Sequence, residues 1–398
     1  MSYADYIQKY NTRMIAALSK DKTIPQSNKQ ELIKFNNFLK AQGRKDRTIS
    51  KNDYCLVIFL KLLGKKDILK VNRADIEAAM AKLEDSQYSP KTKQNVRIVV
   101  KSFFKHAQGE DLFYPKHIAW IKTGIKNEKK LTPSDILTES EIKLLIQNAS
   151  TVRDKAIIAL LFDAGIRVGE LLNMRIRDIN LNQEPALISV DGKTGQRTIP
   201  IIFSVPYIAD YLNSMHDAKP DNYLWHLEGS WKNQKGHADY GAIRMMLKRL
   251  GKKAGLEKRI YPHLLRHSRA SVYANRLTES QLKQFFGWTG DSRMAATYVH
   301  LSARDINNAV LKANGYTVPE KEAETELKVQ VCAKCRLPNQ ATAKYCSRCG
   351  SGLSIETAMQ QAKDKENLQA LFAEWLSNRE AVERQMRILK KKDAKEKD

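Results

Sequence analysis

Apolar residues recur at three- and four-residue spacing through the first part of the chain, a pattern that predicts amphipathic helices. A polar arm over residues 1–27 precedes them, and Ser27 with Gln30 fits a capping box at the start of the first helix. Ser89 followed by Pro90 is typical of a cap and a first helical residue. The expected helices lie at about 28–43, 48–63, 72–84 and 90–109, and they predict a helical domain over 28–110.

The last of these helices carries a cation at every fourth position on one face, namely Lys93, Arg97, Lys101 and Lys105. Like charges at this spacing repel by a few tenths of a kcal/mol each, and a row of phosphates would relieve that repulsion. An ordinary solvated face explains the same pattern equally well. We therefore expect either a DNA-binding stripe or a plain charged surface here.

A polar, basic stretch over 111–137 predicts a linker, and Thr138 with Glu141 fits a capping box that opens a second domain. Two helical segments divided at Gly165 are followed by a hairpin pattern over 186–202 and by further helices up to residue 316. The fold class predicted is mainly α with a small antiparallel sheet. The expected domains are 1–27, 28–110, 111–137, 138–317, 328–354 and 355–398.

The charge balance points to a polyanionic partner. The 68 lysines and arginines exceed the 44 acids and leave a net charge of +24. A surplus of this size favours nucleic acid as the partner over a membrane, because the lysines are spread along the chain rather than gathered on one amphipathic segment. No apolar run reaches about 18 residues, so we expect a cytoplasmic, nucleoid-associated protein without a membrane partner.

Five short segments of the second domain carry side chains suited to phosphate chemistry. They contribute Arg167 with Glu170, Lys193 at the hairpin tip, His263 with Arg266, Trp288, and Tyr298. Each one alone is unspecific, since a lone arginine usually forms a salt bridge and a lone tyrosine usually lies in a core. His267 and His300 are more simply interpreted as structural residues.

The order of these residues resembles the tyrosine recombinase family of the phage integrase type. That family has an arginine in a Gly-x-Arg-x-x-Glu-Leu setting, a hairpin lysine, His-x-x-Arg, Gly-His or Gly-Trp, and then the tyrosine. The resemblance covers residues 28–316. The tryptophan and the ten-residue gap before Tyr298 are similar to archaeal members. The resemblance implies that the catalytic residues are Arg167, Lys193, His263, Arg266, Trp288 and Tyr298. Glu170 would support this set by orienting its neighbours.

The chemistry of DNA strand exchange accounts for these residue types. Two arginines can hold the non-bridging phosphate oxygens, and Tyr298 would form a 3′-phosphotyrosine that conserves the bond energy without ATP. A tyrosine pKa near 10 calls for a base, which His263 could supply, while Lys193 would protonate the leaving oxygen. Trp288 could donate its indole N–H. No cofactor is required for this step, and the resemblance implies a tetramer on two DNA duplexes.

Two other functions fit parts of the sequence. A type IB-like topoisomerase would use the same cleavage chemistry on one duplex without pairing two sites. A non-catalytic DNA-binding regulator of the zinc-ribbon kind would need the basic surface but not the full catalytic set. The presence of that set argues against the regulator. The two-domain layout, which is similar to that of integrases, favours a site-specific recombinase or integrase over a topoisomerase.

Two Cys-x-x-Cys pairs follow the second domain, formed by Cys332 with Cys335 and by Cys346 with Cys349. This spacing predicts a structural Zn²⁺ in a four-cysteine ribbon, in preference to a redox pair or a disulfide clip. Basic residues surround the pairs and suggest contact with DNA or protein: Lys334, Arg336, Lys344 and Arg348. Cys55 is expected in a core.

The C-terminal segment predicts one long helix over about 356–390, followed by a basic tail. Its apolar stripe requires a partner, either another part of this chain or a second subunit. The stripe consists of Leu368, Leu371, Phe372, Trp375 and Leu376.

Overall fold

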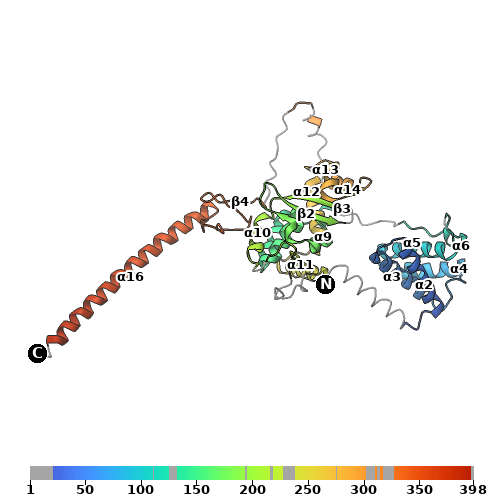
Figure 1. The fold of residues 1–398 in the computed structure, drawn as a ribbon, viewed down its shortest axis with the longest axis horizontal. Coiled ribbons are helices and arrows are strands. Elements are labelled where there is room, and N and C mark those ends of the chain that lie inside the picture. Colours follow the sequence, from blue (N-terminus) through green and yellow to red (C-terminus); the bar gives the residue numbers. More distant parts are fainter. Residues whose placement is uncertain are drawn as a thin grey trace. The chain divides into compact units, whose positions relative to one another are not determined.

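The computed structural model describes residues 21–110, 112–124, 132–192, 195–215, 218–226, 238–274, 276–301, 310–311, 314–316 and 327–395. The described chain divides into two compact units, labelled by element in Figure 1. Residues 21–124 belong to the first unit, and Pro133–Trp225 together with the chain from Tyr240 onward belong to the second. Each unit is described separately.

The first unit is a helical domain with its own core. Ser89 caps α5 by accepting a hydrogen bond from the Thr92 N–H, with Pro90 at the first helical position, as the sequence predicts. The Ser27 capping box is wrong, because α2 begins at Gln26, two residues earlier than expected, after Pro25 and with no side-chain cap. The helices are α2 (Gln26–Ala41), α3 (Asp46–Leu63), α4 (Arg73–Asp85), α5 (Pro90–Ala107) and α6 (Lys116–Ala119).

The apolar face of α5 forms the centre of this core. Phe103 is buried and meets Phe35 of α2 edge to face, with the ring centroids 5.6 Å apart. Cys55 is buried in the same core, as expected. Ile118 and Ile121 are buried there too, so the packed domain extends past residue 110 into the segment interpreted as linker.

The second unit combines helices with one small antiparallel sheet, which confirms the predicted fold class. The sheet order is β1-β2-β3, and Ile188 of β2 pairs with Ile199 of β3. The Thr138 capping box is present at α7. The elements are α7 (Glu139–Asn148), α8 (Val152–Asp163), α9 (Val168–Asn173), β1 (Ile179–Asn180), β2 (Ala186–Gly192), β3 (Gly195–Ile201), α10 (Val205–Asn213), α11 (Tyr240–Lys253), α12 (Pro262–Ala274), α13 (Glu279–Phe286) and α14 (Met294–Leu301), with 3₁₀ turns at Pro133–Asp135 and Ile176–Asp178.

The end of the buried helix α8 is fixed by Asp163. One carboxylate oxygen of Asp163 accepts hydrogen bonds of 2.9 Å from the backbone N–H groups of Ile202 and Ser204. The other carboxylate oxygen pairs with Arg269 of α12 at 2.8 Å. Asp163 therefore connects the end of β3 and helix α12 to the turn between α8 and Arg167.

Gly165 makes this turn after α8 possible. Its φ of +55° lies in the left-handed region, and a Cβ placed on it would stand 2.4 Å from the Phe286 ring. Only glycine allows α13 to approach this turn so closely. The turn sends the chain into α9 with Arg167 at its N-terminal end.

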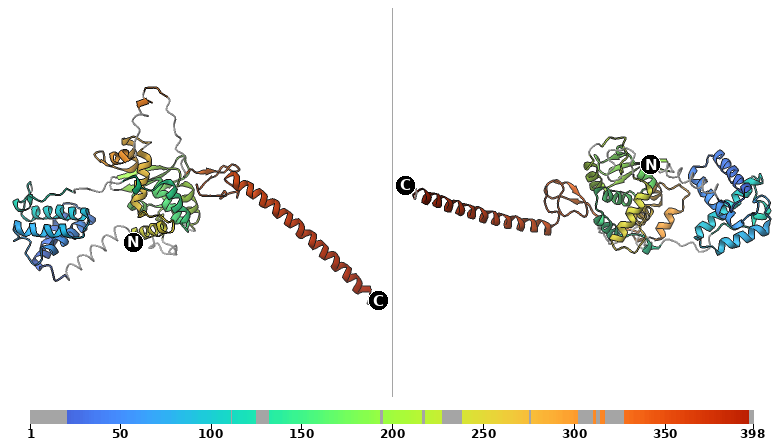
Figure 2. Two further views of the ribbon diagram at one scale, coloured as in Figure 1. Left: turned by 180° about the vertical axis from the view of Figure 1, so that it is seen from behind. Right: turned by 90° about the horizontal axis from the view of Figure 1, so that it is seen from below.

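The chain ends in a two-stranded ribbon of β4 (Gln330–Val331) and β5 (Pro338–Asn339) and in helix α16 (Ile355–Lys395). Figure 2 shows α16 as one uninterrupted helix, as predicted for residues 356–390. Among the described residues, no helix is both long and apolar enough to cross a membrane.

Candidate active site

A buried carboxylate, Glu170 of α9, organises the arginines of the second unit. It accepts hydrogen bonds of 2.9 and 2.8 Å from the backbone and guanidinium of Arg167. Arg197 of β3 adds two more, at 2.9 and 2.8 Å. Burial raises the pKa of Glu170, but the bonds from Arg197 and Arg167 outweigh burial and leave it below the ordinary value. Glu170 is therefore ionised and aims both guanidinium groups.

The turn after α13 contacts both Arg167 and Arg197. Arg167 donates to the Gly287 carbonyl at 3.0 Å. Gly287 has a φ of +58°, and a Cβ on it would stand 2.9 Å from the Arg197 guanidinium. The glycine before Trp288 is thus required by both its backbone conformation and the space that Arg197 fills.

Among the described lysines and arginines, Arg266 of α12 is the most buried, with 3% of the residue exposed. It donates to the Gly165 carbonyl at 2.7 Å and to the Phe286 carbonyl at 2.5 Å. Burial, together with the nearby charge of Arg167, lowers the pKa of Arg266 to about 9. Arg266 is still a cation at neutral pH, and it connects the two turns that flank the site.

Tyr298 of α14 is buried beside Trp288 and His267. Its ring lies parallel to the Trp288 indole, with centroids 5.5 Å apart and an interplanar angle of 3°. Its hydroxyl makes a hydrogen bond with Nδ1 of His267. Burial raises the pKa of Tyr298, and the charge of Arg266 opposes that rise. The phenol is therefore neutral in this arrangement.

The two histidines of α12 lie against each other, His263 at the exposed edge and His267 further inside, with ring centroids 4.5 Å apart. Burial lowers the pKa of His267 to about 4, and repulsion from His263 when that ring is protonated and from Arg266 adds to the decrease. Desolvation, followed by the charges of Arg266 and Arg167, lowers the pKa of His263 as well. At neutral pH both rings are therefore uncharged.

Most of the expected catalytic residues converge, and two further residues join them. The sequence favours a structural role for His267, whereas the structure places it against the Tyr298 hydroxyl. Its i, i+4 spacing from His263 was the available signal. Arg197 was missed because an arginine on a hairpin strand carries no distinguishing pattern. Lys193 lies outside the described residues, as does the side chain of His300.

Comparison with known proteins identifies the family of this chain. The phage integrase family model matches residues 135–304. The tyrosine recombinase XerA of Pyrococcus horikoshii is 32% identical over 292 residues, which cover 72% of this chain and 94% of XerA. XerA of Pyrococcus furiosus is 30% identical, covering 71% of this chain and 93% of that protein. The chain belongs to the tyrosine recombinase family.

Solved structures of other tyrosine recombinases share the fold. A lambda integrase dimer bound to a core site is similar with a TM-score of 0.56 at 18% identity, covering 73% of this chain and 81% of that one. The Tn1549 transposon integrase in complex with transposon DNA is similar with a TM-score of 0.55 at 18% identity, covering 72% and 98%. As a tyrosine recombinase, the protein is an enzyme that breaks and rejoins DNA strands.

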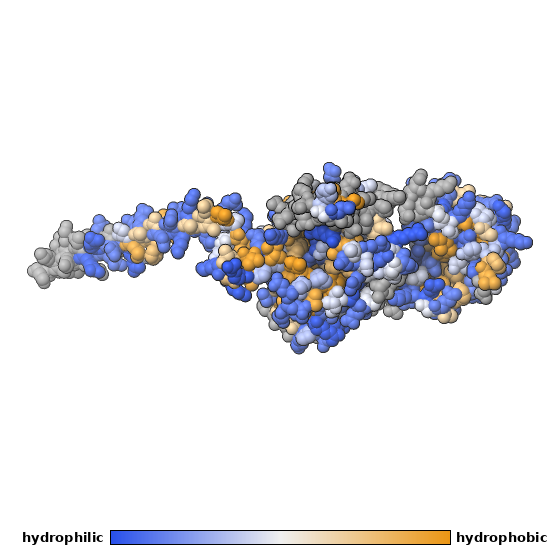
Figure 3. Space-filling view, turned by 90° about the horizontal axis from the view of Figure 1, so that it is seen from above, coloured by the Kyte–Doolittle hydropathy of each residue, from blue (hydrophilic) through white to orange (hydrophobic). Residues whose placement is uncertain are grey.

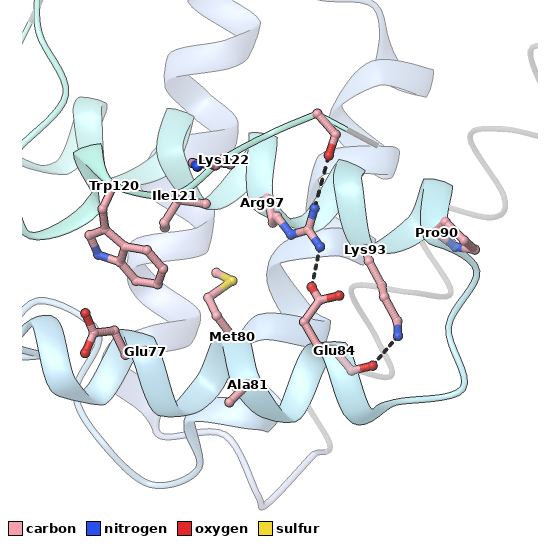
Figure 4. A pocket seen from close by; sticks show the side chains of 11 residues that line it. Glu77, Met80, Ala81, Glu84, Pro90, Lys93, Arg97, Trp120, Ile121 and Lys122 are labelled. Carbon is pink, nitrogen blue, oxygen red and sulfur yellow. Dashed lines mark hydrogen bonds and ion pairs between the residues drawn. The ribbon is translucent and has the colours of Figure 1, made fainter. Parts of the chain in front are cut away.

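The side chains of the basic stripe of this recombinase contact other residues of their own domain, which the sequence does not predict. Arg97 forms an ion pair with Glu84 of α4, and Lys93 donates to the Glu84 carbonyl (Figure 4). Lys101 donates to the carbonyls of Ala119 and Ile121 at 3.3 and 3.1 Å, and both Lys101 and Lys105 lie over the Tyr114 ring. Lys93 and Arg97 line a groove of about 760 Å³. DNA binding by the stripe stays a prediction.

The four paired cysteines of this recombinase come together at one point. Their sulfur atoms all lie within 4.8 Å of one another, and two cross-pair separations are 3.6 and 3.5 Å. A tetrahedral zinc with Zn–S bonds of about 2.3 Å requires sulfurs roughly 3.8 Å apart. Arg336 and Gly350, one residue after each pair, have φ of +60° and +70° and close tight turns around the sulfurs. The cluster can bind one metal ion.

Proposed function

We propose that this enzyme is a site-specific recombinase in which Tyr298 attacks a phosphodiester held by Arg167 and Arg266. The observation that supports it best is the grouping at Tyr298: His267 contacts its hydroxyl, Trp288 stacks on its ring, and the Arg266 guanidinium lies 5.8 Å from the centre of the Trp288 ring. Arg266 and Arg167 each use two donors on backbone carbonyls or Glu170, and a guanidinium has five N–H groups. Donors are left for the two non-bridging oxygens.

The proposed reaction is a transesterification. The Tyr298 oxygen bonds to phosphorus while the bond to the 5′-oxygen breaks, and the product is a 3′-phosphotyrosine. The contact with Nδ1 of His267 favours this histidine, rather than His263, as the acceptor of the phenol proton in the arrangement seen. His263, whose pKa is lowered by burial and by the charges of Arg266 and Arg167, is proposed to face the phosphate. Lys193 is proposed to protonate the leaving oxygen.

The proposed partner is double-stranded DNA in the cytoplasm. The net charge of +24 suits binding to a polyanion. Lambda integrase has been crystallised both as a dimer on a core site and as a tetramer on a Holliday junction. We propose by analogy that four protomers of this chain assemble on two DNA sites, with the Lys93–Lys105 stripe adding contacts to phosphates.

We propose that the four cysteines hold Zn²⁺ in a structural role. Four thiolates would fill the tetrahedral coordination sphere and leave no position for substrate. Asn339 is buried beside the cluster, where it accepts from the Ser347 N–H at 3.0 Å and lies 3.7 Å from the Cys346 sulfur. The exposed Lys334, Arg336, Lys344 and Arg348 would give the ribbon an additional contact with DNA.

Substitution of the nucleophile tests this function. On a nicked suicide substrate, Tyr298→Phe is expected to bind DNA like the native enzyme but to form no SDS-resistant protein–DNA adduct, because the attacking oxygen is gone. Tyr88→Phe, at a half-exposed tyrosine of the first unit, is the control and is expected to form the adduct at the native rate. An adduct formed by Tyr298→Phe would show that another residue is the nucleophile.

A further inference from the structure

Helix α16 carries an apolar face that nothing in the recombination chemistry uses. Leu368, Phe372 and Trp375 are 68%, 59% and 54% exposed, and Val382 and Met386 follow at 52% and 59%. Every residue from Ala358 to Arg387 whose side chain is described is exposed. The space-filling view of Figure 3 shows apolar side chains in orange along this helix. A face of this kind requires a partner in water.

The spacing of this face specifies another helix as its partner. The positions 368, 372, 375, 379, 382 and 386 alternate steps of four and three residues, which is the 3.5-residue repeat of a coiled coil. Arg379 is the one charged residue in this series. A parallel pair in register would place Arg379 against Arg379 of the second helix, which is unfavourable.

Charge along α16 favours an antiparallel pair. Residues 356–374 contain four acids and two lysines, a net charge of −2, whereas residues 375–395 contain seven basic and three acidic residues, a net charge of +4. Two copies that run in opposite directions bring each acidic half against a basic half. Parallel copies would place basic against basic.

One antiparallel register satisfies every position of the repeat. With the pair centred on Ser377, Leu368 meets Met386, and Phe372 meets Val382 of the second copy. Arg379 then lies opposite Trp375, so its guanidinium can stack on the indole across the interface. Within one helix Arg379 already lies 5.6 Å from the centre of the Trp375 ring and pairs with Glu383 at 3.2 Å. Arg379 therefore fits the antiparallel register, although it is the charged residue of the series.

We propose that α16 pairs with α16 of a second copy of this chain as an antiparallel coiled coil. The helix is held firmly to the ribbon at its start. The Gln361 side chain donates to the Gly350 carbonyl at 2.9 Å and accepts from the Gly352 N–H at 3.0 Å. A Cβ on Gly352 would stand 2.6 Å from the Ala358 nitrogen, so the ribbon and helix are in close contact. The pairing joins two protomers without DNA.

Sedimentation velocity on the full-length, metal-loaded protein without DNA tests the pairing. The native chain is expected to be dimeric at micromolar concentration. The double variant Phe372→Glu/Trp375→Glu is expected to weaken the dimer at least about 100-fold, because the pair would bury four carboxylates. The helix face is exposed in one copy, so the variant should fold normally. Ala370→Glu/Ser377→Glu adds the same charge on the opposite face and should leave the dimer intact.

Cysteine cross-linking tests the direction of the pair. A mixture of differently tagged Leu368→Cys and Met386→Cys chains should form the mixed disulfide, and Leu368→Cys alone should not cross-link to itself. The native chain controls for its own cysteines. A monomeric native chain, an equally dimeric Phe372→Glu/Trp375→Glu variant, or self-cross-linking of Leu368→Cys would each overturn the proposal.

Discussion

Replacing Glu170 by glutamine should expose how much the arginine cluster depends on one buried carboxylate. The side chain of Glu170 is 2% exposed and receives four hydrogen bonds from Arg167 and Arg197. Glutamine keeps the shape, but it removes the negative charge and turns one acceptor into a donor that faces guanidinium N–H groups. The cluster would then contain Arg167, Arg197 and Arg266 without their shared counter-charge.

The expected loss of stability follows from burial and exposure. Removing one partner of a buried ion pair costs about 3–5 kcal/mol, and because Arg167 is 31% exposed we take the lower end, about 3 kcal/mol. For a unit of this size that corresponds to a decrease of about 6–12 °C in the Tm of the second unit. Calorimetry on the full chain measures it. Glu257→Gln, which removes one negative charge from the segment after α11, is the control.

The pH dependence provides a second check on the same variant. The pKa of Glu170 is lowered in the folded protein, so its contribution is complete above the unfolded value of about 4.5 and is lost as the pH falls through the folded value. The stability difference between native and Glu170→Gln chains should therefore be constant near neutrality and shrink in acid below about pH 4. A difference below about 1 kcal/mol at pH 7 would refute the reasoning.

Two further predictions concern the turn before Arg167 and the cysteine cluster. Gly165→Ala should lower the free energy of unfolding by about 2–4 kcal/mol in urea titrations, because alanine is strained in the left-handed region and its Cβ would collide with Phe286. Gly169→Ala, with open space around the Cβ, is the control and should be neutral or slightly stabilising. Equal effects at both glycines would contradict this reasoning. Chelation of the proposed Zn²⁺ should increase proteolysis within 328–354 and leave single-turnover cleavage intact. Loss of cleavage with DNA binding preserved would mean that the metal has a part in the chemistry.

Local signals explain most of what the sequence predicts correctly. Ser89-Pro90 and Thr138 with Glu141 specify helix starts through contacts within four residues, and the structure has both. The capping box at Ser27 was predicted wrongly because Pro25, with its fixed φ, precedes a helix that starts two residues earlier than expected. The extra strand β1 pairs over only two residues, too few to leave a pattern.

The site was predictable where its order along the chain carries information. Arg266 and Tyr298 follow from that order, but the contacts of His267 and Arg197 depend on how α12, α14 and β3 pack. The stripe from Lys93 to Lys105 shows the opposite case. Its spacing is regular in sequence, yet folding gives Arg97 an acidic partner on α4, which no helical pattern reveals.

The backbone carbonyls that receive the arginine side chains have a consequence for substrate binding. Arg167 and Arg266 are each fixed by two hydrogen bonds before any DNA is present. A free arginine side chain loses roughly 1.5–2 kcal/mol of rotamer entropy when it is immobilised. Here folding has already absorbed that loss, so a phosphate bound at the proposed site would meet guanidinium groups whose rotamer entropy is already lost.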